Sequence, residues 1–300
     1  MPSMAHTPDA SCPRVEIEAY RAEQVSFRYS QPGPRADDRA SWVLRGLTFE
    51  VAPGEVLGVL GPNGSGKSSL LKLLAKVLLL QEGAIHLFGR SIDACSQTEV
   101  ARTVALVPQQ SQLLFPFTIV ETVLMGRFPH QQGRGGFTGF GWETPGDIRL
   151  AEQAMDAMGI LPLAGRPISA VSDGERQRAI VARALAQTPR VLLLDEPTVF
   201  LDLRHQLDIC AILRRLNSED GLTVVLVSHD LNLASQYCDR LLLLKDGEIF
   251  RIGTPDEVIR QEVLEAVYHC RVLVDRHPVS GLPRVTLPGR EATHNVKRTS

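Results

Sequence analysis

Residues 61–68 have the types and the spacing of a loop that binds phosphate groups. They fit the pattern G-x-x-x-x-G-K-[ST] and stand between an apolar run at 56–60 and a segment of helical composition at 69–75. Glycines let successive N–H groups turn toward phosphate oxygens, and the following helix adds the positive end of its dipole. Lys67 would contact the β- and γ-phosphates, and the Ser68 hydroxyl would bind Mg²⁺. The sequence therefore predicts a nucleotide site formed by Gly61, Pro62, Asn63, Gly64, Ser65, Gly66, Lys67, Ser68 and Ser69.

A second group of reactive side chains follows a buried strand later in the chain. The apolar run 191–194 leads directly into Asp195 and Glu196. A parallel strand presents the residue at its carboxyl end to the edge of the sheet where α/β folds bind ligands. Asp195 would hold Mg²⁺, directly or through water, and Glu196 would polarise the water that attacks the γ-phosphate. A solvated acidic turn has the same local sequence, but the phosphate loop in the same chain favours a catalytic site.

The elements that must position these residues follow from the hydrophobic pattern. Alternating apolar and polar residues at 15–27 and 44–51 predict antiparallel strands with one solvated face. The continuous apolar runs 191–194 and 223–227 predict parallel strands that are buried on both faces. Because helical patterns lie between these strands, we expect a parallel α/β sheet at the core.

The composition is that of an ordinary globular protein. The chain has 300 residues, 44% hydrophobic and 22% charged, and no apolar run reaches the roughly 18 residues of a membrane-spanning helix. Its formal net charge of −2 argues against a general nucleic-acid binder. No secretory signal is apparent at the start. The cysteines lack CxxC spacing and are expected to be reduced thiols of a cytosolic protein: Cys12, Cys95, Cys210, Cys238 and Cys270.

A third motif, Val-Ser-Asp-Gly-Glu at 171–175, leads into a helical segment. On its own it is also a helix N-cap, because a serine side chain satisfies free N–H groups of the first turn. With the two motifs above, the chain resembles the ATP-binding cassette (ABC) ATPases, whose Leu-Ser-Gly-Gly-Gln/Glu signature precedes the strand with the catalytic carboxylates. Ser172, Gly174 and Glu175 match this signature, and Asp173 departs from it.

The resemblance implies roles for four further residues. Tyr29 matches the aromatic residue that stacks on adenine, and Gln109 matches the Q-loop glutamine that touches Mg²⁺ or the attacking water. Asp202 falls at the end of the D-loop, although residues 199–200 are bulkier than is usual there. His229 matches the switch histidine that contacts the γ-phosphate.

The resemblance covers roughly residues 15–255 and implies a P-loop NTPase fold of the α/β class. Its parallel-sheet core would carry an antiparallel β subdomain and a helical subdomain that ends in the signature. Helical stretches at 119–125 and 147–158 around a Gly-rich loop at 133–142 are typical of such an insertion. We expect a disordered leader at 1–14, a β core at 15–118 and 170–255, a helical subdomain at 119–169 with the signature at 171–175, a C-terminal extension at 256–288 and a flexible tail at 289–300.

The family also implies how the chain works. Two cassettes pack head to tail and bury ATP with Mg²⁺ between the phosphate loop of one copy and Ser172 and Gly174 of the other. Since one chain carries one cassette, we expect a homodimer whose opening after hydrolysis is the mechanical output. Asp173 would either point away from the triphosphate, leaving the Gly174 amide to contact it, or weaken ATP-driven closure.

Softer similarities concern the cargo. The segment 115–130, with its Gly-Arg-Phe-Pro-His end, is similar to importer cassettes for ferric siderophores, haem and cobalamin, as are segments 229–234, 244–247, 264–268 and 277–281. This implies metal-chelate uptake through separate membrane permease subunits at the cytoplasmic face of the inner membrane, indirectly served by a solute-binding protein. His130 and His277 are not expected to bind metal, because their positions lack ligand spacing.

Three other interpretations concern the same residues. An exporter cassette is often fused to a membrane domain, and no spanning segment occurs in the sequence. A non-hydrolysing regulatory module would lack Glu196 or His229. A soluble cytosolic ABC ATPase, for example of the iron–sulfur assembly type, is compatible with the length of the chain and stays open as the alternative.

Overall fold

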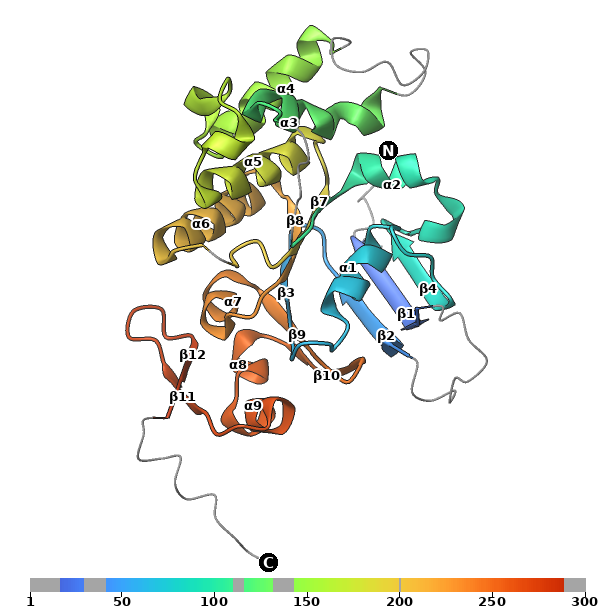
Figure 1. Ribbon diagram of the computed structural model, residues 1–300. Helices are drawn as coiled ribbons and strands as arrows, with labels where there is room; N and C mark the ends of the chain where they lie inside the picture. The colour runs from blue at the N-terminus through green and yellow to red at the C-terminus, as the bar shows by residue number, and fades with distance from the viewer. Residues whose placement is uncertain (1–16, 30–41, 110–115, 132–142, 200, 289–300) are drawn as a thin grey trace, which may run out of the picture.

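A computed structural model describes residues 17–29, 42–109, 116–131, 143–199 and 201–288. The expected leader at 1–14, the Gly-rich loop at 133–142, Phe200 and the tail at 289–300 lie outside these residues, as does Cys12. Within the described ranges the chain forms two main sheets with helices around them (Figure 1). No helix in these ranges is long and apolar enough to cross a membrane.

The central sheet has six strands in the order β10-β9-β3-β8-β7-β6. Strands β9, β3, β8, β7 and β6 are parallel to their neighbours, and β10 pairs antiparallel with β9 at the edge. The parallel core expected from the apolar runs is therefore confirmed. The strands are β3 (Val56–Leu60), β6 (Val104–Val107), β7 (Val191–Asp195), β8 (Thr223–Val227), β9 (Arg240–Lys245) and β10 (Glu248–Gly253).

The parallel strands are buried on both faces, which explains their continuous apolar sequences. Along β7, Leu192 and Leu194 belong to one hydrophobic cluster, together with residues of the long helices. Val191 and Leu193 point to the other face and belong to a second cluster, which is shared with the smaller sheet. Because side chains alternate between the faces of a strand, each strand must be apolar at every position to serve both cores.

A four-stranded antiparallel sheet packs beside the central one, with the order β2-β1-β4-β5. Its strands are β1 (Tyr20–Phe27), β2 (Leu44–Val51), β4 (Glu82–Leu87) and β5 (Arg90–Ser91). We expected a strand from Val15, which lies outside the described residues, and residues 17–19 precede the strand that begins at Tyr20. Tyr20 pairs with Val51 and Leu87, the last residues of β2 and β4, and among the described residues only single bonds from Ala19 to Val51 and from Phe88 to Ala19 extend the pairing before it. Helix α1 (Lys67–Leu74) lies between the two sheets (Figure 1).

A layer of helices lies between β6 and β7 in the chain and covers the upper end of Figure 1. The helical stretches expected there are confirmed, although α4 begins two residues early because Thr144 caps it and Pro145 starts its first turn. Thr118 and Ser172 form the same kind of capping box before α3 and α5. The elements are α3 (Ile119–Leu124), η2 (Met125–His130), α4 (Pro145–Ala157), η3 (Leu161–Leu163), η4 (Ile168–Ala170) and α5 (Asp173–Ala186).

The Gly-Arg-Phe-Pro-His segment joins this layer to the end of α5. A Cβ on Gly126 would overlap the Arg183 carbonyl, so the backbones approach closely. Arg127 Nε donates to Asp147 Oδ1 at 2.9 Å, and its Nη1 donates to the Ala186 carbonyl at 2.7 Å. Both side chains of the ion pair are buried, with 8% and 12% of their surface exposed.

The remaining elements lie before β6, after β7 and β8, or at the C-terminal end of the described chain. A hairpin of β11 and β12 packs on α7, where the Asn232 side chain bonds both the N–H and the C=O of Val285 at 2.7 and 3.1 Å. The elements are η1 (Ile92–Ala94), α2 (Gln97–Thr103), α6 (Leu203–Asp220), α7 (Leu231–Tyr237), α8 (Pro255–Val258), α9 (Gln261–Tyr268), β11 (Leu273–Arg276) and β12 (Pro283–Thr286).

We predict that Arg127→Met lowers the free energy of unfolding by about 3 kcal/mol, because it leaves the buried Asp147 carboxylate without its cation. Urea denaturation would measure the change. Arg90→Met is the matched control, since Arg90 pairs with Glu99 at 3.5 Å on the surface and its loss should cost less than about 1 kcal/mol. Equal losses for the two variants would contradict a structural role for the buried pair.

Candidate functional site

The predicted phosphate loop connects β3 to α1, and its backbone requires glycine at two points. Gly61 and Gly66 have φ angles of +147° and +98°, which L side chains rarely adopt. A Cβ on Gly61 would lie 2.7 Å from Ser65 Oγ, and one on Gly66 would lie 2.9 Å from the Val43 carbonyl. Lys67 is the first residue of α1, and its Nζ donates to the Gly61 and Pro62 carbonyls at 2.8 and 2.9 Å.

The loop fits the phosphates of a nucleotide. The buried Ser65 hydroxyl has no hydrogen-bond partner among the described residues, as expected of a group that serves a ligand. Nothing lies within 4 Å of the position of a Cβ on Gly64. The helix that starts at Lys67 directs its first N–H groups toward the same loop. These donors, the ammonium of Lys67 and the hydroxyl of Ser65 together suit a polyphosphate.

Asp195 lies beside this loop at the carboxyl end of β7. Its Oδ1 accepts a hydrogen bond from Ser68 Oγ at 3.1 Å. Burial raises the pKa of Asp195, and the neighbouring Glu196 charge raises it further, against the opposing effect of Ser68 and the nearby lysines. Burial also lowers the pKa of Lys67, although the two carboxylates oppose this shift. A hydroxyl and a buried carboxylate in contact are the hard oxygen ligands that Mg²⁺ prefers.

Glu196 joins two other predicted site residues. Gln109 Nε2 donates to Glu196 Oε2 at 2.6 Å, and His229 Nε2 contacts Glu196 Oε1. Gln109, Glu196 and His229 follow β6, β7 and β8, which are neighbours in the parallel sheet, so their side chains meet at one edge. Glu196 has a φ of +52°, an uncommon conformation for a residue with a side chain. Such strain is found at sites where a side chain must be aimed.

Tyr29 lies on the side of the phosphate loop. Its hydroxyl is 3.1 Å from Ser69 Oγ, and its ring meets Phe27 edge-on at a centroid distance of 4.9 Å. With 48% of its surface exposed, Tyr29 is not a core residue, and its ring is accessible to a flat ligand. This is the property that stacking on a base requires.

The signature residues form a separate group at the N-terminus of α5. Glu175 Oε2 accepts from the Ser172 N–H and hydroxyl, both at 2.9 Å, and these bonds lower the pKa of Glu175. Asp173 pairs with Arg176 at 2.9 Å and is 74% exposed, so its carboxylate is directed along its own helix. Among the described residues, no hydrogen bond or ion pair connects this group to the phosphate loop of the same chain.

Asp202 caps α6, and two residues that the sequence analysis missed hold it there. Asp202 Oδ1 accepts from the His205 N–H at 2.9 Å and lies 2.7 Å from His205 Nδ1. Gln206 Nε2 donates to the Leu201 carbonyl at 2.9 Å. The sequence carries one signal for this arrangement, because an Asp N-cap bonds the N–H three residues later.

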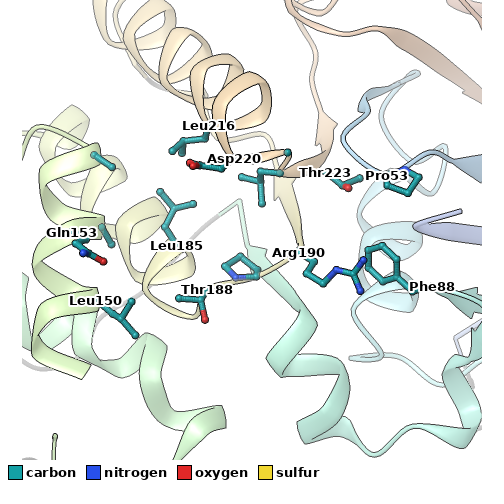
Figure 2. Close-up of a pocket in the computed structure, with 15 residues that line it drawn as sticks. Pro53, Phe88, Leu150, Gln153, Leu185, Thr188, Arg190, Leu216, Asp220 and Thr223 are labelled. Carbon is teal, nitrogen blue, oxygen red and sulfur yellow. The ribbon is translucent and has the colours of Figure 1, made fainter. Parts of the chain in front are cut away.

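A cavity of about 530 Å³ lies at the opposite edge of the central sheet, where β7 and β8 begin (Figure 2). Leu150 and Gln153 of α4 face Leu216 and Asp220 of α6 across it, and the Arg190 guanidinium lies 3.5 Å from the centre of the Phe88 ring. None of the residues of the predicted nucleotide site lines this cavity. Its size therefore does not identify the site of nucleotide chemistry.

Comparisons with known proteins agree with this geometry. The profile of the family described as "ABC transporter" matches residues 44–199. The hemin import ATP-binding protein HmuV of Gloeobacter violaceus is 42% identical over 268 residues, covering 84% of this chain and 94% of that protein. The ferric enterobactin transport ATP-binding protein FepC of Escherichia coli is 39% identical over 276 residues, covering 92% and 96%.

A solved structure of similar fold is the dimeric ATP-binding cassette MJ0796 in a post-hydrolysis state, bound to ADP and Pi. It has a TM-score of 0.65 and is 28% identical in sequence. The match covers 78% of this chain and 98% of that one. The fold of the described residues is thus that of an ATP-binding cassette.

We predict that Lys67→Ala weakens nucleotide binding at least about tenfold, because it removes a charge aimed at the phosphates. Fluorescence titration with a methylanthraniloyl derivative of ATP would measure this. Lys67→Arg is the comparison variant, which keeps the charge but not the compact ammonium and should bind less well than the native chain. Unchanged affinity in Lys67→Ala, with the fold intact by circular dichroism, would refute the assignment.

Proposed function

Because the chain belongs to the ABC transporter family, we propose that it is the ATP-hydrolysing subunit of an importer of metal chelates, of the ferric siderophore, haem or cobalamin type. The observation that supports the ATPase assignment most directly is the meeting of Gln109, Asp195, Glu196 and His229 beside the phosphate loop. These side chains lie at the ends of neighbouring strands. Their chemical types are those needed to bind Mg²⁺ with a triphosphate and to activate water.

Each residue would make a distinct contribution to hydrolysis. The loop N–H groups and Lys67 would bind the phosphates, and Tyr29 would stack on the adenine. Ser68, Asp195 and Gln109 would hold Mg²⁺, which supplies charge neutralisation to the phosphate oxygens when bound. Glu196 would take a proton from the attacking water, and its bonds to Gln109 and His229 fix the direction of its carboxylate. His229 would contact the γ-phosphate.

We also propose that the working unit is a homodimer with ATP between the copies. In this arrangement Ser172, Gly174 and Glu175 of one copy, with Asp202, complete the site of the other. Among the described residues no hydrogen bond or ion pair connects Ser172, Gly174 or Glu175 to the phosphate loop of their own chain, and this leaves them available to a second copy. Asp173 does not obstruct it, because its carboxylate pairs with Arg176 on its own helix.

The cargo class and the other partners are inferred from relatives and from the subfamily-like segments. Haem and ferric enterobactin, named for two similar proteins, are both iron chelates. We infer that separate permease subunits bind this chain at the cytoplasmic face of the membrane, and that a solute-binding protein delivers the chelate to them. The subfamily-like segments disfavour the alternative, a soluble ABC ATPase uncoupled from transport. Nothing in the site suggests a nucleic-acid partner, which the net charge of −2 also disfavours.

We predict that Glu196→Gln binds ATP but does not hydrolyse it, because the amide keeps the shape of the side chain and cannot accept the proton. Under saturating ATP and Mg²⁺ the variant should accumulate as a dimer in analytical ultracentrifugation. EDTA should return it to the monomer, since Ser68 and Asp195 would then lack their cation. A monomer under saturating ATP–Mg²⁺ would count against the shared site.

The importer assignment can be tested by recovering tagged Glu196→Gln from native membranes with ATP and Mg²⁺, followed by mass spectrometry. We expect a polytopic permease to be recovered. The double variant Glu196→Gln/Lys67→Ala is the matched control, because loss of nucleotide binding should leave the dimer open. Recovery of soluble proteins without a permease would favour the uncoupled cytosolic ATPase and leave the nucleotide chemistry unchanged.

A further inference from the structure

His205 connects the signature loop to the end of the D-loop within one chain. Its Nδ1 lies 2.7 Å from Asp202 Oδ1. The other side of its ring lies against the signature glycine, since a Cβ on Gly174 would come within 2.6 Å of the ring Cγ and 2.7 Å of Nε2. Gly174 is buried at this contact, and the His205 side chain is 26% exposed.

The ring approaches Gly174 from the side on which a side chain would project. The N–H groups in the first turn of a helix point along its axis, out of the N-terminus. The imidazole and a ligand of those N–H groups would therefore occupy different sides of the residue. His205 can hold the signature loop in place and still leave the end of α5 open to a phosphate.

The contact between His205 and Gly174 joins the N-terminal ends of α5 and α6, and each helix is also bonded to a different part of the chain. Gly174 lies in the first turn of α5, whose far end is bonded to Arg127 in the helical layer. Asp202 caps α6, and Gln206 holds the loop before it by donating to the Leu201 carbonyl. Near their N-termini the two helices meet at the His205 ring.

We propose that His205 is a positioning residue that holds the signature loop and the D-loop at the spacing at which both reach the nucleotide of a second copy. The inference rests on the proposed ATP-driven dimer. The contact also explains why residue 174 is a glycine, because any side chain there would overlap His205 of the same chain. His205 does not touch the nucleotide bound to its own phosphate loop in this scheme.

The test measures dimer formation and monomer binding separately, in the Glu196→Gln background. His205→Ala removes both contacts, and His205→Phe keeps a ring against Gly174 but cannot bond Asp202. Arg204→Ala is the control, because Arg204 is exposed on the same turn of α6. Analytical ultracentrifugation with ATP–Mg²⁺ gives the dimer Kd, and titration of dilute protein with methylanthraniloyl-ATP gives the monomer Kd.

For His205→Ala we expect a dimer Kd about tenfold higher for each of the two shared sites, roughly 100-fold in all, from the lost bond and packing. Its monomer affinity should stay within about twofold of the parent, which is a change below 0.5 kcal/mol. His205→Phe should fall between the parent and His205→Ala. Arg204→Ala should match the parent in both measurements.

Three results would overturn the inference, and they separate it from the proposed function. Unchanged dimer affinity in His205→Ala, with a parent that dimerises, refutes the positioning role and leaves the shared site intact. An equal loss of monomer affinity, or a matching loss of stability in urea, shows a general fold contact instead. A Glu196→Gln parent that stays monomeric refutes the dimer, and the inference falls with it.

Discussion

Burial of two adjacent carboxylates at the carboxyl edge of a parallel sheet is the constraint on which the rest of the site depends. Charged oxygens are costly to remove from water unless donors replace the lost hydration. Here Ser68 bonds Asp195, while Gln109 and His229 contact Glu196. These partners follow different strands, so they can meet the carboxylates when β3, β8, β7 and β6 lie in that order across the sheet.

The catalytic side chains were predictable because each belongs to a short local pattern. Lys67 and Ser68 follow from the glycine spacing, and Asp195 and Glu196 follow from the apolar run before them. The parallel core was predictable for a related reason, since strands buried on both faces are apolar at every position. The roles of these residues stay predictions, because each role is defined by contact with a nucleotide. The domain boundaries also stay predictions.

Features that depend on tertiary contacts were not predictable. The start of β1 is set by where β2 and β4 end, which the sequence of β1 does not encode. The sequence analysis missed His205 because the proposed role of His205 depends on its contact with Gly174, a residue of another helix. The sequence left the orientation of the Asp173 carboxylate open, although the partner of this carboxylate lies on the same helix. In the structure the Asp173 carboxylate pairs with Arg176, three residues along the same helix, and an exposed pair at this spacing contributes about 0.2–0.5 kcal/mol.

Helix α5 connects these observations, because different parts of the chain contact its two ends. At its N-terminus Gly174 lies against His205, and at its C-terminus the Ala186 and Gln187 carbonyls meet Arg127 and His130. Its 14 residues span about 21 Å at 1.5 Å per residue. The segment that resembles importer cassettes and the residues that contact the signature thus meet opposite ends of one helix.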